Sequence, residues 1–315
     1  MDNKKKKLRK DSSKIGFLLF SIVIIILFIN RFLIGKLFSI DQHDLIRKVT
    51  NIFTFLGIPT IIFSILLKTK GKSIKKIINL NFKREKILVY LLISFFVKIF
   101  AGFIATAVAS ILELFNIKST MPNFDYGSTA LSIFLSFIRL AIVAAIAEEF
   151  VFRGAILNLL KPYGKKFAIL ASSLLFGLFH GNVEQFISAF LMGLYFAYVA
   201  CKTESIIPSV IMHFLNNFLS LFFVLYESNI IINNEIVLNL VLFTFIAGVL
   251  GFIFFMNMLF KNSEKLKISN IFKRSKRCED FKLSDKFNAL FFNPGMTLFM
   301  IETFVMFYFS VERVY

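Results

Sequence analysis

Long apolar stretches separated by short basic segments constrain this chain more than any other feature of its sequence. Residues 15–38, 87–115 and 236–260 carry few charges, and each is long enough as a helix to cross a hydrocarbon core of about 30 Å. Within lipid, a spanning segment must satisfy its own backbone hydrogen bonds, which favours helices. Hydrophobic residues make up 57% of the chain, against roughly 45–50% in soluble domains. The sequence therefore predicts an all-α fold, a polytopic transmembrane helix bundle.

We predict eight or nine spans. Eight apolar segments are expected to cross the membrane, at residues 15–38, 52–67, 87–115, 129–160, 167–180, 186–200, 206–226 and 236–260. A ninth, at residues 297–309, is short but apolar, and Pro294 just before it favours a helix start.

The basic residues indicate how these spans are oriented. The chain has a net charge of +18, and most of its 37 Lys and Arg fall in three segments, residues 1–14, 68–86 and 262–290. Loops rich in Lys and Arg stay on the cytoplasmic side, so we expect a cytoplasmic N-terminus. No motif for binding nucleic acid is visible, and the bilayer is the partner that explains this charge pattern.

Three ionisable residues fall inside the fourth predicted span, at residues 129–160. Glu148, Glu149 and Arg153 would together cost about 8–10 kcal/mol if they were charged and unpaired in the bilayer. Glu149 and Arg153 are four residues apart, so they share a helix face and can pair. Glu148 points about 100° away and needs another partner. Ionisable residues at such a depth mark a candidate functional site.

Two further polar pairs lie on later spans at the same spacing. Phe176 and His180 share one face of the fifth span, and His213 and Asn217 share one face of the seventh. Two of the three histidines in the chain are therefore inside predicted spans, where each needs a polar partner. Glu148 is a natural one.

These segments, AEEFVFRG, FGLFH and MHFLNN, resemble the three motifs of the CAAX-processing and bacteriocin-processing (CPBP or Abi) intramembrane proteases. The resemblance covers residues 131–224, and it rests on all three motifs occurring in order on apolar helices. It divides the chain into N-terminal helices with a basic tail and loop (1–127), CAAX-protease-like catalytic helices (128–226), and C-terminal helices with a basic segment (227–315).

The resemblance implies a catalytic role for four residues. Glu148 would be the general base that activates a water for attack on a peptide carbonyl, and His180 would hold the same water. His213 and Asn217 would donate hydrogen bonds to the oxyanion. No covalent nucleophile is implied. Counted from the cytoplasmic turns, these side chains start at different depths, so they converge only if the fourth and fifth helices tilt or project.

Supporting roles and a metal complete the implied site. Glu149 paired with Arg153 would orient the fourth helix, and Phe176 would pack beside the reacting groups. Glu148, His180 and His213 also form a zinc-capable set, and the family has been labelled metal-dependent. The H-E-x-x-H signature is absent, and glutamate–water chemistry requires no cofactor, so Zn²⁺ stays an open alternative.

The expected activity is that of an intramembrane endopeptidase acting on a membrane-associated or lipidated peptide. The Lys-, Asn-, Ile- and Phe-rich composition is typical of an AT-rich bacterial genome, so we expect a multi-pass protein of the bacterial plasma membrane. Two alternatives remain open. One is a non-catalytic bacteriocin-immunity membrane protein, and the other is an ion- or proton-coupled transporter that uses the intramembrane Glu, His and Arg.

Overall fold

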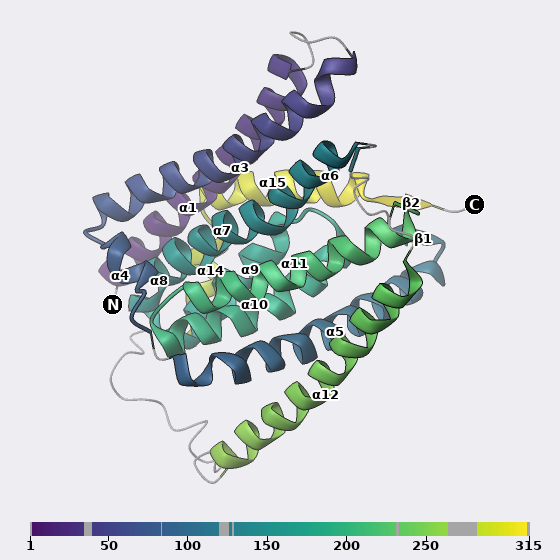
Figure 1. The fold of residues 1–315 in the computed structure, drawn as a ribbon. Helices are drawn as coiled ribbons and strands as arrows, with labels where there is room; N and C mark the ends of the chain where they lie inside the picture. The colour runs from purple at the N-terminus through teal and green to yellow at the C-terminus, as the bar shows by residue number, and fades with distance from the viewer. Residues whose placement is uncertain are drawn as a thin grey trace.

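The computed structural model of the protein describes residues 2–34, 40–82, 84–119, 126–127, 129–230, 233–263 and 282–313. Nearly all of this chain is helical, and Figure 1 shows long helices lying side by side. Seven helices in the described residues are long and apolar enough to cross a membrane, or up to eight if one bent pair forms a single span. The predicted all-α membrane bundle is confirmed.

The N-terminal helices supply one side of the bundle and its basic loop. They are α1 (Asp2–Phe28), continued by the π-helical η1 (Ile29–Ile34), then α3 (Ile40–Thr69), the short α4 (Ile74–Ile78), the 3₁₀ turn η2 (Arg84–Lys86) and α5 (Ile87–Glu113). Ser73 caps α4 by accepting a hydrogen bond from the backbone N–H of Lys76. The basic segment between the second and third spans therefore contains a helix.

The predicted fourth span is one long rod with changes of helical type. It consists of α6 (Ala130–Phe137), η3 (Ile138–Val143), α7 (Ala144–Glu149), η4 (Phe150–Ile156) and α8 (Leu157–Leu160), and it ends in η5 (Lys161–Tyr163). Both η3 and η4 are π-helical. A π segment accommodates an extra residue and is frequent at functional sites. Thr129 caps the start of this rod by accepting from the Ser132 N–H.

Three helices pack against this rod, and the first and last of them carry the remaining motifs. They are α9 (Lys165–Phe179), α10 (Val183–Thr203) and α11 (Ile207–Glu227). At 15 residues, α9 is about 22 Å long, which is short for a 30 Å hydrocarbon core. It corresponds to the fifth predicted span, and many of its residues are buried inside the bundle, including Ala168, Ala171 and Leu175.

The C-terminal elements close the bundle on two sides. They are α12 (Asn234–Ser263), α14 (Leu283–Phe291) and α15 (Pro294–Phe309). The ninth predicted span corresponds to α15, which is bent by 77° from α14. A two-stranded antiparallel ladder joins β1 (Ile117–Ser119) to β2 (Val311–Arg313). Much of the predicted basic segment 262–290 lies outside the described residues.

Glycines let several of these helices approach closely. A Cβ atom on Gly16 of α1 would overlap the backbone of α15 at Gly295, and one on Gly251 of α12 would overlap the backbone of α5. Such close crossings are the usual way for membrane helices to gain packing contacts where lipid offers no hydrophobic driving force.

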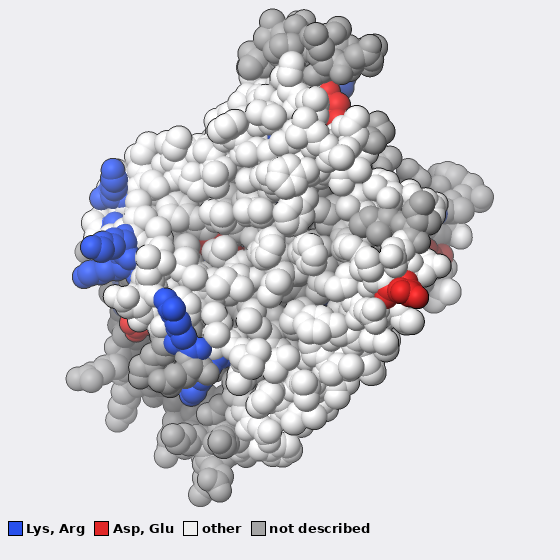
Figure 2. Space-filling view, viewed as in Figure 1, with Lys and Arg blue, Asp and Glu red and all other residues white. Residues whose placement is uncertain are grey.

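The surface has the polarity of a membrane protein. Figure 2 shows Lys and Arg gathered at the edge where Figure 1 places α4, α8 and the N-terminus, next to a broad face that carries few charges. On α12 the exposed side chains are large and apolar, among them Phe243, Phe245 and Ile246. A face of this kind is stable against lipid rather than water.

Candidate active site

The predicted pair between the first-motif glutamate and arginine is present. Arg153 donates from Nη1 to Oε1 of Glu149 across 2.7 Å, and both side chains are fully buried. Glu149 ends α7 and Arg153 lies in η4, four residues further on. A buried ion pair needs further hydrogen bonds to offset the loss of hydration. Yet Oε2 of Glu149 and the Nε and Nη2 of Arg153 have no hydrogen-bond partner among the described residues.

His213 connects the third motif to the first. Its Nδ1 lies 2.9 Å from Oε1 of Glu149, and because a carboxylate accepts, Nδ1 carries the hydrogen. On the other side of the ring, Nε2 lies 3.8 Å from Oε2 of Glu148. That distance is too long for a direct hydrogen bond. The hydrogen bond from Nδ1 to Glu149 therefore orients the ring of His213, and Nε2 of the same ring faces Glu148.

Glu148 differs from Glu149 in its surroundings. Its side chain is 22% exposed, whereas that of Glu149 is fully buried. Adjacent residues on a helix point about 100° apart, so these two glutamates have different surroundings. Glu149 is enclosed in a structural network, and Glu148 keeps a carboxylate that is accessible and held by no short bond to His213.

Phe176 packs at the centre of the three motifs. Its ring centroid is 4.2 Å from Cζ of Arg153, a cation–π distance, and 5.8 Å from the ring of His213. It also contacts His180 edge to face at 4.9 Å. The predicted place of Phe176 beside the polar groups is therefore what the structure has, and this ring joins the second motif to the other two.

His180 is the C-cap of α9, and its tautomer follows from its bond. Its Nδ1 lies 2.8 Å from the backbone carbonyl of Phe176. A carbonyl only accepts, so Nδ1 carries the hydrogen, and in the neutral ring Nε2 is left as an acceptor. His180 is partly buried and reaches the cluster through the ring of Phe176.

Asn217 bonds the third motif to the π-helical segment η3. Its Nδ2 donates to the carbonyl of Leu140 across 3.0 Å. An amide nitrogen carries two hydrogens, so one remains for a further partner. Four residues earlier, His213 bonds α7, so the two motif residues tie successive turns of α11 to the rod.

Two residues of α10 pack against the cluster, and neither was predicted from the sequence as a site residue. A Cβ atom on Gly193 would lie 3.1 Å from Nη2 of Arg153 and 3.1 Å from Cδ1 of Phe176. Phe196, one turn on, contacts the ring of His213 at 5.6 Å and lies 5.5 Å from Cζ of Arg153. A glycine inside a helix costs up to about 1 kcal/mol and marks a close approach, which was the available signal for Gly193.

A lysine outside the motifs bonds the helix that carries the third one. Lys98 of α5 donates to the backbone carbonyl of Asn216 at 3.2 Å and to the Ser220 hydroxyl at 2.6 Å. These bonds join α5 to α11 at the turn that carries His213 and Asn217 and at the turn that follows it.

The zinc-capable set does not assemble in this arrangement. Among the described residues, no three His, Cys, Asp or Glu side chains are grouped so as to hold a metal ion. The Nδ1 of His213 is bonded to Glu149, and that of His180 to a backbone carbonyl. These bonds leave Nε2 of each ring open, as in metal-binding histidines, so the spread of Glu148, His180 and His213, and not their hydrogen bonds, is the reason that they form no zinc centre as placed.

Comparison with known proteins gives one match. The family model described as type II CAAX prenyl endopeptidase Rce1-like matches residues 130–219, a range that holds all three motifs and less than a third of the chain. No curated protein and no solved structure matches the chain. The matched range nearly coincides with the residues that carry the resemblance found in the sequence.

Proposed function

Residues 130–219 carry a domain of the Rce1-like type II CAAX prenyl endopeptidase family, and from this premise we propose that the protein is an intramembrane endopeptidase. The single observation that supports this most is the convergence of the three motifs. His213 lies between Glu149 and Glu148, and Phe176 packs against Arg153, His180 and His213.

Glu148 is the proposed general base. Its carboxylate is the accessible one of the two, whereas that of Glu149 is held by short contacts to Arg153 and His213. A water beside it would give its proton to the carboxylate as the oxygen attacks the peptide carbonyl. The bond to the Phe176 carbonyl fixes the tautomer of His180, so its Nε2 would accept a hydrogen bond from the other O–H of that water. Glu148 would then return the proton to the departing amine.

His213 and Asn217 are the proposed oxyanion donors. Asn217 has one N–H left after its bond to Leu140, and its position on α11 is fixed by that bond. His213 gives Nδ1–H to Glu149, so it donates to an oxyanion only when Nε2 is also protonated. Glu149 would hold the ring in place for that step, and Arg153 would hold Glu149.

The substrate would be a membrane-associated or lipidated peptide. A site enclosed by membrane helices meets a peptide bond only where the substrate itself lies in or at the bilayer, and the family acts on prenylated substrates. We place the basic end of the bundle, with the N-terminus, on the cytoplasmic side by the distribution of Lys and Arg.

The test is cleavage by the purified full chain in nanodiscs. Fluorogenic peptides that are prenylated, acylated or membrane-spanning would be offered to the wild type, Glu148→Gln and His180→Ala, each with and without a chelator. We expect cleavage by the wild type alone, and no effect of the chelator. The thermal unfolding midpoint of each variant controls for loss of the fold.

Each other result has a defined meaning. Cleavage that survives Glu148→Gln removes that residue from the role of base. Cleavage lost with chelator and restored by Zn²⁺ replaces the water-activating scheme by a metal-assisted one. If the wild type is inert toward every peptide, the protease proposal is withdrawn, and protection from bacteriocins or ion flux in liposomes becomes the function to measure.

A further inference from the structure

A second site lies at the basic end of the bundle. A cavity of about 540 Å³ is lined by five cationic side chains and one carboxylate, that of Glu204. The cationic residues are Lys72, Lys76, Arg153, Lys161 and Lys165. Glu148, His180 and His213 do not line it, so this cavity is separate from the proposed catalytic groups.

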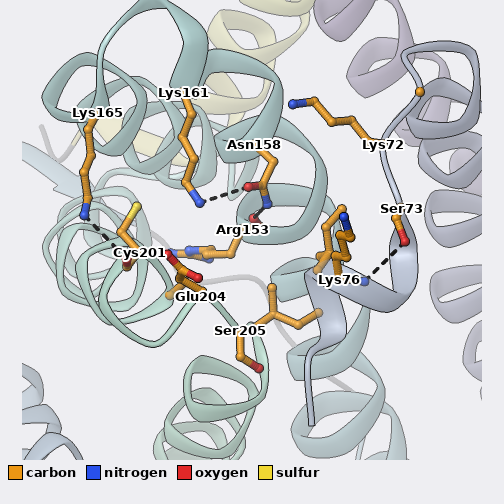
Figure 3. Close-up of a pocket in the computed structure, with 14 residues that line it drawn as sticks. Lys72, Ser73, Lys76, Arg153, Asn158, Lys161, Lys165, Cys201, Glu204 and Ser205 are labelled. Carbon is orange, nitrogen blue, oxygen red and sulfur yellow. Dashed lines mark hydrogen bonds between the residues drawn. The ribbon is translucent and has the colours of Figure 1, made fainter. Parts of the chain in front are cut away.

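The lysines of the cavity come from four parts of the chain. Lys72 comes from the α3–α4 linker, Lys76 from α4, Lys161 from η5 and Lys165 from the start of α9, and Figure 3 shows them arranged around Arg153. Cys201 and Ser205, at and after the end of α10, complete the wall.

Hydrogen bonds hold α4 in its place as one wall. Ser205 donates to the carbonyl of Ile78 at 2.8 Å, and the N–H of Ile206 donates to the carbonyl of Ile77 at 3.2 Å. Asn79 adds a bond to the carbonyl of Glu204 at 3.4 Å. The wall is therefore part of the fold, and its lysines are held beside the others.

Arg153 is the residue that the cavity shares with the three motifs. Its side chain is fully buried, yet Nε and Nη2 have no hydrogen-bond partner in the described chain. Such donors are costly to bury unsatisfied. The lysines add charge of the same sign, and among the described residues Lys161 and Lys165 bond only neutral oxygens, of Asn158 and Cys201. A concave site with an excess of positive charge concentrates counter-ions, and lysine ammonium groups bind phosphate oxygens as point charges.

We propose that this cavity binds a phosphate group, with Arg153 at its base and Lys76, Lys161 and Lys165 around it. The phosphate belongs to the headgroup of an anionic phospholipid or to a soluble phosphate. Since Arg153 also bonds Glu149, which bonds His213, the occupant would be joined by one side chain to the proposed active site.

The test uses Cys201 as a reporter of occupancy. The chain has two cysteines, so Cys278→Ser leaves Cys201, which lines the cavity, as the single thiol. Its rate of reaction with methyl methanethiosulfonate would be followed in full-length protein under two conditions. One is neutral detergent with added inorganic phosphate or with chloride at equal ionic strength. The other is nanodiscs of phosphatidylcholine with or without phosphatidylglycerol.

A matched pair of variants isolates the cavity. Lys76→Gln with Lys165→Gln removes two cavity charges, and Lys75→Gln with Lys166→Gln removes the neighbouring charges on the same two helices. Each contact to a charged group contributes enough that the first pair is expected to raise the apparent Kd about tenfold or more. The second pair is expected to behave as the wild type.

The outcomes separate the sources of phosphate. Protection of Cys201 by phosphate in detergent assigns a soluble ligand, and protection only in phosphatidylglycerol nanodiscs assigns a lipid headgroup. Equal rates in all conditions, or protection that persists in the Lys76 and Lys165 variant, overturns the proposal.

If the Cys201 thiol does not react with the reagent, thermal unfolding is the second measurement of binding. Phosphate or phosphatidylglycerol should raise the thermal unfolding midpoint of the wild type and of the Lys75 and Lys166 variant, and should leave the cavity variant unchanged. Absence of that shift also overturns the proposal. Neither readout involves peptide cleavage, so the result is independent of the proposed protease activity.

Discussion

The Nδ1 of His213 lies 2.9 Å from Oε1 of Glu149, so α11 is bonded to α7 inside the bundle. The same oxygen accepts from Arg153, and this shared acceptor makes one network of the first and third motifs. The adjacent Glu148 stays outside that network of short bonds. Glu149 therefore belongs to the structural network, and the proposed catalytic role falls to the adjacent Glu148.

Glu148→Gln and Glu149→Gln are expected to fail in different ways. Glu148→Gln should lower the cleavage rate by about 10²–10⁴, the usual contribution of a general base, and leave the unfolding midpoint nearly unchanged. Glu149→Gln removes the carboxylate from a fully buried arginine, which typically costs about 3–5 kcal/mol. Paired cleavage and thermal unfolding measurements distinguish the two, and identical effects would contradict the division of roles.

The Glu149–Arg153 pair is expected to be strongly coupled. Glu149→Leu and Arg153→Met should each destabilise the protein by about 3–5 kcal/mol, because each leaves a buried charge without its partner. The double variant removes both charges and should be more stable than either single one. A double-mutant cycle by denaturation in detergent measures this coupling, and additive effects would show that the pair contributes nothing.

Gly193→Ala is expected to disturb the site through packing. The new methyl group would press on Nη2 of Arg153 and on Phe176, at a cost of about 1–3 kcal/mol, with lower cleavage. Gly102→Ala is the matched control, because a Cβ there meets nothing within 4 Å. It should be neutral or stabilise the helix by about 0.5–1 kcal/mol. Equal stability of the two variants would remove Gly193 from the site.

Asn217→Leu is expected to act on kcat. Loss of an oxyanion donor typically lowers kcat by about 10²–10³ and leaves KM largely unchanged. Asn158→Leu serves as a comparison, since its amide bonds the carbonyls of Arg153 and Gly154 and the ammonium group of Lys161, all on the cavity side. An effect of Asn217→Leu confined to KM would assign the residue to substrate binding instead.

The motif residues and the membrane class could be read from the sequence because both depend on local patterns. Apolar length indicates a span, and a spacing of four puts Glu149 beside Arg153. Which glutamate bonds His213 depends on how α11 packs against α7, and the sequence analysis favoured Glu148. Gly193, Phe196 and Lys98 lie outside the motifs, so only the packed structure shows their contacts.

The environment of the short helix α9 and the basic cavity could not be predicted from the sequence, because both depend on how distant segments pack. A mostly apolar run of 14 residues at 167–180 suits either a span or a buried core helix, and only its neighbours decide which it is. The cavity lysines are spread over residues 72–165, and in sequence they are ordinary members of basic loops. Their grouping around Arg153 arises from three connections meeting at one end of the bundle.

The π-helical segments on either side of α7 let the rod hold an extra residue without changing its phase. Removing one residue from η3 or η4 would let the rod continue as an ordinary α-helix, and the residues beyond the deletion would stay close to their present rotation. In an ordinary α-helix the same deletion would rotate everything beyond it by about 100° and shift it by about 1.5 Å. Glu148 and Glu149 would therefore keep their neighbours and lose only the widened turn beside them.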